Sequence, residues 1–211
     1  MRQKMFDLAK GTMWDVEQSF YEAAFDGFLE IRFPGIHLLD GCDQGNRIHF
    51  EGDALVHTAK VFSYASAIGG LSASDRFVLL VAAAVHDICK PQTRCLRNGK
   101  VTFYGHDWRA ARRCPEFAQN VSMDPGEAER LAWAVCWHMN VQRLLNFCPA
   151  KRLSFYQSPH WPVLQALQVA DAQATWLNRE GSECAPILQS LFAADHVQLL
   201  TAAVARETVR V

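Results

Sequence analysis

The chain has 211 residues, half of them hydrophobic, and a formal net charge of −1. This length fits one domain with a sizeable core, and the near-neutral charge gives no general case for binding nucleic acid or membranes, although it does not exclude a local basic patch. The seven cysteines form no CxxC pair, which argues against a zinc ribbon or a disulfide framework and indicates buried, reduced thiols. The N-terminus lacks the apolar run of a signal peptide and no stretch reaches membrane-spanning length, so we expect a soluble, cytoplasmic protein.

The first 50 residues are expected to lead into the main body of the domain. Apolar side chains at roughly helical spacing predict one helix over residues 12–29. Residues 31–52 are rich in Gly, Pro, Asp and Asn, and this composition predicts an irregular segment.

Two strongly apolar helices are expected next. The helical period returns over residues 53–70, where a Gly-Gly pair ends it. Ser72 and Ser74 are candidate N-caps of the following helix, whose body FVLLVAAAVHDI is stopped by Pro91.

A small hairpin then interrupts the helices. Residues 94–104 predict this hairpin, with its turn at Asn98-Gly99. Further helices are expected from His106 towards Arg113, from Pro125 to about Met139, over 160–178 and near 186–207.

These elements predict an all-α fold, a helical bundle with a small hairpin insertion. We expect a single domain over residues 1–211. Within it, 1–50 would form the N-terminal lead-in, 51–178 the helical core and 179–211 a C-terminal helical cap.

Histidine and aspartate side chains lie on the apolar faces of four expected helices. By helical spacing these core-facing residues are His57, His86, His138 and Asp171, and Asp87 stands next to the second of them. A single inward histidine is more often a hydrogen-bonded core residue than a metal ligand. Three histidines and two carboxylates together are costly to bury without a cation, so the set indicates a metal site.

Two further residues have alternative interpretations. His106, in FYGHDW, is either a ligand of a second ion or a residue near the helix N-cap, where Asp107 is favoured by the helix dipole. Lys90 either neutralises a phosphate oxygen or compensates the negative end of the preceding helix.

The donor types restrict the metal. Imidazole and carboxylate ligands suit divalent transition metals such as Mn, Ni, Co, Fe or Zn, whereas Mg accepts fewer imidazoles. We expect two ions, since a carboxylate such as Asp87 can bridge them while His86 binds only one. Two ions would hold opposing phosphate oxygens and generate hydroxide near neutral pH, with Asp87 and Lys90 as the expected catalytic residues.

The order of these residues resembles the HD superfamily of metal-dependent phosphohydrolases. The likeness is closest to the HD domain of bacterial CCA-adding enzymes (tRNA nucleotidyltransferases) and covers roughly residues 34–176. Four segments carry it: HFEGDALVHTAKV at 49–61, AAAVHDICKP at 82–91, FYGHDWRAA at 103–111 and LQVADAQAT at 167–175. No nucleotidyltransferase head precedes these motifs, so the resemblance does not imply CCA addition.

The resemblance implies a binuclear centre. Carried over position by position, the ligands of the first ion would be His57, His86, Asp87 and Asp171. His106 and His138 would complete the second ion, with Asp87 bridging the two.

The sequence departs from the family pattern at three positions. Cys89 stands where the family usually has Gly, and Val56 replaces an acidic residue. Trp137 stands where the family often has His or Arg, a change that would alter the substrate pocket or weaken the second ion.

Arginines follow His106 on the same expected helix. Arg109 and Arg112 are candidate substrate-binding residues, because with Arg113 they can form a basic rim for a nucleotide or RNA phosphate. A solvated helix face explains them as well. The hairpin carries a similar basic cluster, open to the same two interpretations: Arg94, Arg97 and Lys100.

The resemblance implies cleavage of phosphomonoesters or 2′,3′-cyclic phosphodiesters of nucleotides or RNA ends through a metal-bound hydroxide. Two other functions stay open: an HD-fold diiron oxygenase and a catalytically silent, metal-containing binding module. Iron content and oxygen consumption would separate the oxygenase from the hydrolase. We expect a nucleotide or RNA-end phosphate ester as the partner, no membrane, and no DNA-binding motif.

Overall fold

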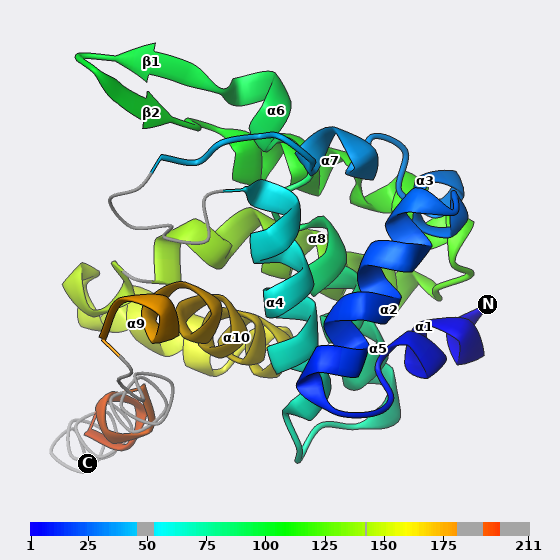
Figure 1. Ribbon diagram of the computed structural model, residues 1–211. Coiled ribbons are helices and arrows are strands. Elements are labelled where there is room, and N and C mark those ends of the chain that lie inside the picture. Colours follow the sequence, from blue (N-terminus) through cyan, green and yellow to red (C-terminus); the bar gives the residue numbers. More distant parts are fainter. Residues whose placement is uncertain (46–52, 142, 181–191, 199–211) are drawn as a thin grey trace, which may run out of the picture.

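The structure, a computed structural model, describes residues 1–45, 53–141, 143–180 and 192–198. This part of the chain is an all-α bundle with one two-stranded hairpin, as predicted (Figure 1). Its centre consists of four helices: α4 (Ala54–Ala67), α5 (Ala73–Val85), α8 (Pro125–Val141) and α10 (Trp161–Glu180). Helix α10 packs on each of the other three, and α5 also packs on α4 and α8.

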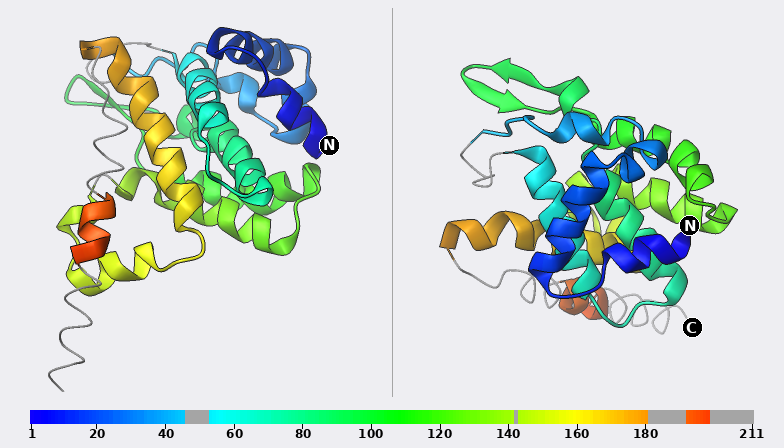
Figure 2. Two further views of the ribbon diagram at one scale, coloured as in Figure 1. Left: turned by 90° about the horizontal axis from the view of Figure 1, so that it is seen from below. Right: turned by 45° about the vertical axis from the view of Figure 1, so that its right-hand side comes forward.

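Short helices at the N-terminus cover one side of this bundle. They are α1 (Arg2–Leu8), α2 (Met13–Phe25), α3 (Phe28–Arg32) and the 3₁₀ helix η1 (Ile36–Leu39). The single helix predicted over residues 12–29 is wrong in extent, because Gly27 adopts φ 85° and separates α2 from α3. Figure 2 shows α4 between α2 and α10, so the N-terminal helices lie opposite α10. The predicted irregular segment contains η1, and residues 46–52 lie outside the described residues.

Side chains cap the starts of α4 and α5, and of the two predicted N-caps of α5 Ser72 is the one observed. The Asp53 side chain accepts hydrogen bonds from the amides of Leu55 and Val56. Ser72 caps α5 by accepting from the Asp75 amide, whereas Ser74 lies in the first turn. Every residue of 77–85 on α5 is buried, which explains why this segment is apolar on all sides.

The segment after α5 differs from the prediction at Pro91. Helix α5 ends at Val85, and Pro91 lies in the first turn of the short helix α6 (Lys90–Thr93), where a missing amide hydrogen costs nothing. Strands β1 (Cys95–Arg97) and β2 (Lys100–Thr102) then form the predicted antiparallel hairpin. Its turn residues Asn98 and Gly99 have φ 51° and 71°, the positive values that a tight hairpin requires.

The remaining helices lie close to their predicted positions, with one extension. Helix α7 (His106–Asn120) continues past Arg113 and through Pro115, because Cys114, Phe117 and Ala118 bury its inner face. It is followed by α8, η2 (Leu144–Asn146), α9 (Pro149–Tyr156) and α10. Of the helix predicted near 186–207, residues 192–198 are helical, and the others lie outside the described residues.

The cysteines of the described part are free thiols. Cys42, Cys89 and Cys114 are buried as expected, but Cys95 and Cys148 are exposed. The expectation that the thiols are buried is therefore wrong for these two. Cys95 is exposed because it lies on the hairpin, outside the packed bundle. Among the described helices, none combines the length and hydrophobicity needed to cross a bilayer.

Candidate metal centre

All six residues predicted as ligands converge inside the bundle, where each is buried. His57 comes from α4, His86 and Asp87 from the end of α5 and the turn after it, His106 from the first residue of α7, His138 from α8 and Asp171 from α10. Helical periodicity placed His57, His86, His138 and Asp171 on core-facing sides, and the packing of the helices brings those sides together.

The donor atoms form two groups, each compact enough to hold a metal ion. One group contains His57, His86 and Asp171, and the other contains Asp87, His106 and His138; within each, the donor atoms lie within 4.8 Å of one another. In the first group, His57 Nε2 lies 3.1 Å from Asp171 Oδ1. This grouping agrees with the division into two ions that the family resemblance implied.

Asp87 joins the two groups through its two oxygens. Its Oδ2 lies 3.2 Å from His86 Nε2 and 3.7 Å from His57 Nε2. Its Oδ1 lies 3.1 Å from His106 Nε2 and 3.7 Å from His138 Nε2. The carboxylate therefore faces one set of histidines with each oxygen, the arrangement that a bridging ligand needs.

Backbone hydrogen bonds orient three of the imidazoles. In each, Nδ1 lies within hydrogen-bond distance of a backbone carbonyl three residues earlier: His86 to Ala83 at 2.9 Å, His106 to Phe103 at 2.7 Å and His138 to Val135 at 2.7 Å. Because a carbonyl only accepts, Nδ1 must carry the proton, and in the neutral ring Nε2 then presents a lone pair. Three lone pairs are thus directed at the centre.

Without a cation these lone pairs lack donors. His86 Nε2 is buried and makes no hydrogen bond to any described residue. His106 Nε2 and His138 Nε2 face each other at 3.3 Å, which leaves two acceptors in contact when both rings are neutral. Divalent Mn, Fe, Co, Ni or Zn accepts this mixture of imidazole and carboxylate donors, so the residues fit a metal.

Both carboxylates are held in the ionised form that binds metal. Burial acts to raise the pKa of Asp87, but the charge of His86 when that ring is protonated, the charge of Lys90, and hydrogen bonds that His106 and His138 donate in their protonated forms lower it well below its usual range. Burial opposes the ionisation of Asp171 in the same way, and the hydrogen bond and charge of His57 lower its pKa. At neutral pH the centre therefore contains two negative charges.

Lys90 is the cation nearest to this centre. Its Nζ lies 2.6 Å from Asp87 Oδ2 and donates to Gln44 Oε1, and its side chain is buried. Gln44 in turn donates to the backbone oxygen of Asp53 at the start of α4. Sequence reasoning missed Gln44, because it lies in an irregular segment where no periodicity indicates which side chains point inward.

The predicted substrate residues Arg109 and Arg112 lie in a surface pocket. The pocket has a volume of about 450 Å³ and is lined by Cys89, Gln92, Trp108, Arg109, Arg112 and Arg113. Among the described residues, its lining includes none of the six candidate ligands, so a role for these arginines at the metal centre stays a prediction.

Trp137 and three further histidines contact residues that are not among the six candidate ligands. The Trp137 ring packs against Phe155 of α9 at a centroid distance of 5.0 Å. Histidines outside the motif have their own partners: His37 pairs with Glu30, His160 with Glu129, and His196 stacks on Tyr156. His49, in the first of the four segments that carry the family resemblance, lies outside the described residues.

A scan against models of protein families finds no match for this chain, and a search of curated proteins likewise finds no significant match.

Proposed function

We propose that this protein is a metal-dependent phosphohydrolase of the HD superfamily. Its substrates would be phosphomonoesters or 2′,3′-cyclic phosphodiesters of nucleotides or RNA ends. The observation that carries the proposal is the position of Asp87, whose two oxygens face separate histidine groups at 3.1 to 3.7 Å.

The chemistry of the donor set supports hydrolysis. A divalent ion supplies Lewis acidity, which neutralises phosphate charge and makes a water molecule more acidic. His57, His86 and Asp171 would hold one ion, and His106 and His138 the other, with Asp87 shared. A purely structural site needs only one closed set of ligands, so a second adjoining set favours catalysis.

The protein's own groups have distinct tasks in this proposal. Asp87 holds both halves of the centre at a fixed separation, and the backbone carbonyls behind His86, His106 and His138 keep their Nε2 atoms directed inward. Lys90, paired with Asp87, keeps the carboxylate ionised and limits its movement. Neutralising a substrate phosphate requires Lys90 to leave this pair, so we assign it the positioning task.

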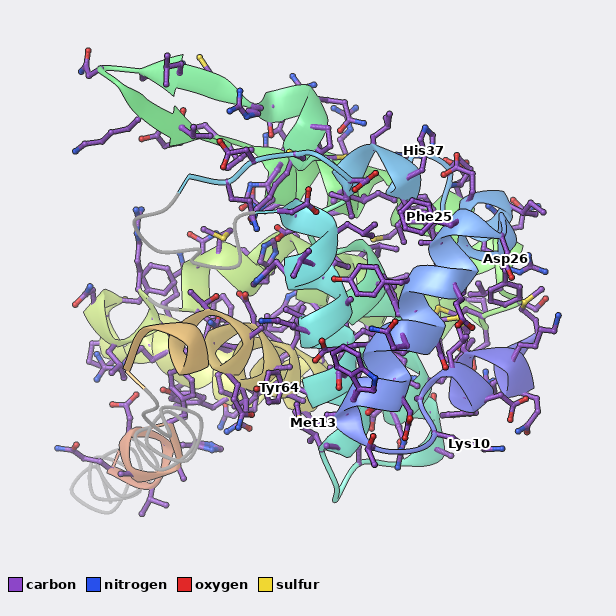
Figure 3. All side chains as sticks on the ribbon, in the orientation of Figure 1. Lys10, Met13, Phe25, Asp26, His37 and Tyr64 are labelled. Carbon is purple, nitrogen blue, oxygen red and sulfur yellow. The ribbon has the colours of Figure 1, made fainter. Side chains whose placement is uncertain are left out.

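The direct test is turnover by metal-depleted protein refilled with Mn, Ni, Co or Mg. The substrates are p-nitrophenyl phosphate, its bis-ester and 2′,3′-cyclic AMP. We expect metal-dependent release that disappears in Asp87→Ala and persists in His37→Gln. His37 is a suitable control because it is an exposed histidine outside the centre, as its position in Figure 3 shows.

Two results would contradict the proposal. Full activity in Asp87→Ala would remove the assigned centre from the reaction. Absence of turnover with every metal, together with tight iron binding and oxygen consumption, would favour the diiron oxygenase instead.

A further inference from the structure

Positive charge is concentrated in one short segment of this chain. Residues 94–113 contain six Arg and Lys residues and a single Asp, although the whole chain has a net charge of −1. The segment comprises the hairpin, the connection after it and the first half of α7. Figures 1 and 2 show the hairpin projecting away from the bundle beside α6, and every one of these cations except Arg113 is exposed.

Two of these cations are already engaged by the fold. Arg94 pairs with Asp43 and donates to its backbone oxygen. Arg113 donates to the Pro34 carbonyl at 2.6 Å and lies over the Phe117 ring. Both side chains therefore have partners within the fold, and we assign them a structural role.

The other four cations form no ion pair within the described part of the chain. Arg97 and Lys100 lie on the hairpin, and Arg109 and Arg112 lie on α7. The guanidinium of Arg97 lies 5.3 Å from the Tyr104 ring, and those of Arg109 and Arg112 lie 5.9 and 5.2 Å from the Trp108 ring. Their charge therefore remains available to an anion.

The aromatic rings between these cations are unusually exposed. Tyr104 is 73% exposed and Trp108 is 46% exposed. The indole of Trp108 lies against Gly105, where an added Cβ would be 2.7 Å from Nε1. Packing against the helix cap thus holds the Trp108 ring at the surface, beside the pocket of about 450 Å³ that it lines with Arg109 and Arg112.

We propose that this basic–aromatic surface, formed by Arg97, Lys100, Tyr104, Trp108, Arg109 and Arg112, binds single-stranded nucleic acid. Arginine and lysine contact the phosphates, while exposed rings stack on unpaired bases, a combination that suits a single strand. An acidic protein would use the charges but not the ring faces, and the bases of a duplex are already stacked on one another.

The position of the surface also connects it to the metal centre. Arg109 lies one helical turn after His106, the first residue of α7 and a member of the second ligand group. The surface and the second ligand group therefore share the first turns of α7. Binding itself does not depend on the proposed hydrolase activity.

The experiment measures fluorescence anisotropy of a labelled single-stranded oligonucleotide with the full chain. The probes are oligouridylate and oligothymidylate of about 12 nucleotides, within the usual site size, with ends that carry no phosphate. They cannot be consumed as phosphomonoesters, so binding is read without turnover. Comparison of the two probes distinguishes RNA from DNA as the source of the strand.

Charge reversal and ring removal should give different signatures. Arg109→Glu/Arg112→Glu should weaken binding strongly at moderate salt. At low salt, where binding stays measurable, the slope of log affinity against log salt should fall by about 0.7 for each lost phosphate contact. Trp108→Ala should weaken binding about five- to hundredfold without changing that slope, and Trp108→Phe should restore most of it. Lys10→Glu reverses one charge at the opposite end of the molecule, half the charge change of the double variant, and should leave affinity unchanged (Figure 3).

The proposal is overturned by no saturable binding at about 50 mM salt, a condition that favours phosphate contacts. It is also overturned if Lys10→Glu weakens binding as much as the α7 variants do. Competition by polyglutamate as effective as competition by the oligonucleotide would identify an acidic protein as the partner instead. Hydrolysis of p-nitrophenyl phosphate, measured separately, shows whether the proposed activity fails independently of binding.

Discussion

Asp87 and Lys90 form a buried ion pair at the centre of the ligand cluster. The Lys90 ammonium lies 2.6 Å from Asp87 Oδ2, on the oxygen that also faces His86. A buried carboxylate that loses its partner is strongly destabilising, unless another cation replaces it. In the metal-free protein Lys90 supplies that compensation.

We therefore predict that Lys90→Met lowers the stability of metal-free protein by roughly 3 to 5 kcal/mol. Added Mn should restore more of the melting temperature in Lys90→Met than it adds in the wild type, because the ion takes over the neutralisation of Asp87. Thermal denaturation with and without metal checks this. Lys100→Met, on the exposed hairpin, is the control. Equal destabilisation by Lys90→Met in both conditions would contradict the metal linkage.

Residues of the site could be predicted where they lie on regular helices. His57, His138 and Asp171 share helix faces with apolar residues, so periodicity alone placed them inward. His106 begins a helix, where periodicity says little, and the family resemblance indicated it. Gln44 could not be predicted, since its contact with Lys90 depends on how an irregular segment folds over α6.

At the scale of elements, one buried carboxylate ties three helices together. Glu127 of α8 accepts a hydrogen bond from Arg2 of α1 at 2.6 Å and from Ser74 of α5 at 2.7 Å, and it is only 1% exposed. Arg130 of α8 also donates to Ser74. This network secures the N-terminal helix to the bundle, away from the metal ligands.

Glu127→Gln should lower the free energy of unfolding by about 1 to 3 kcal/mol, because one charged acceptor at a buried site is lost. Glu129→Gln changes an exposed carboxylate on the same helix and should alter stability by less than about 0.5 kcal/mol. Urea denaturation of the two variants makes the comparison. Similar losses in both would show that the network contributes no more than surface charge.

Element boundaries were predictable where local chemistry marks them. Asp53, Ser72 and Pro125 each begin a helix by capping or by suiting a first turn, and Asn98-Gly99 marks the hairpin. The extension of α7 through Pro115 was not predictable, because tertiary packing of its inner face outweighs the local cost of proline.

At the scale of the whole molecule, the centre depends on the arrangement of the bundle. The ligands come from residues 57 to 171, and no two adjoining helices supply a complete group. Helical periodicity predicted that several of these side chains point inward, whereas their division into two groups joined by Asp87 was implied only by the family resemblance. That division results from how α4, α5, α8 and α10 pack together.

The most direct test counts the metal ions bound after dialysis against Mn or Ni, in wild-type protein and in two variants. The wild type should bind about two ions per chain, as expected for a two-metal site. His138→Ala should retain about one ion, since only the second group loses a ligand, and Asp87→Ala should lose both. A wild type without bound metal, or an Asp87→Ala protein that keeps the full count, would contradict the binuclear centre.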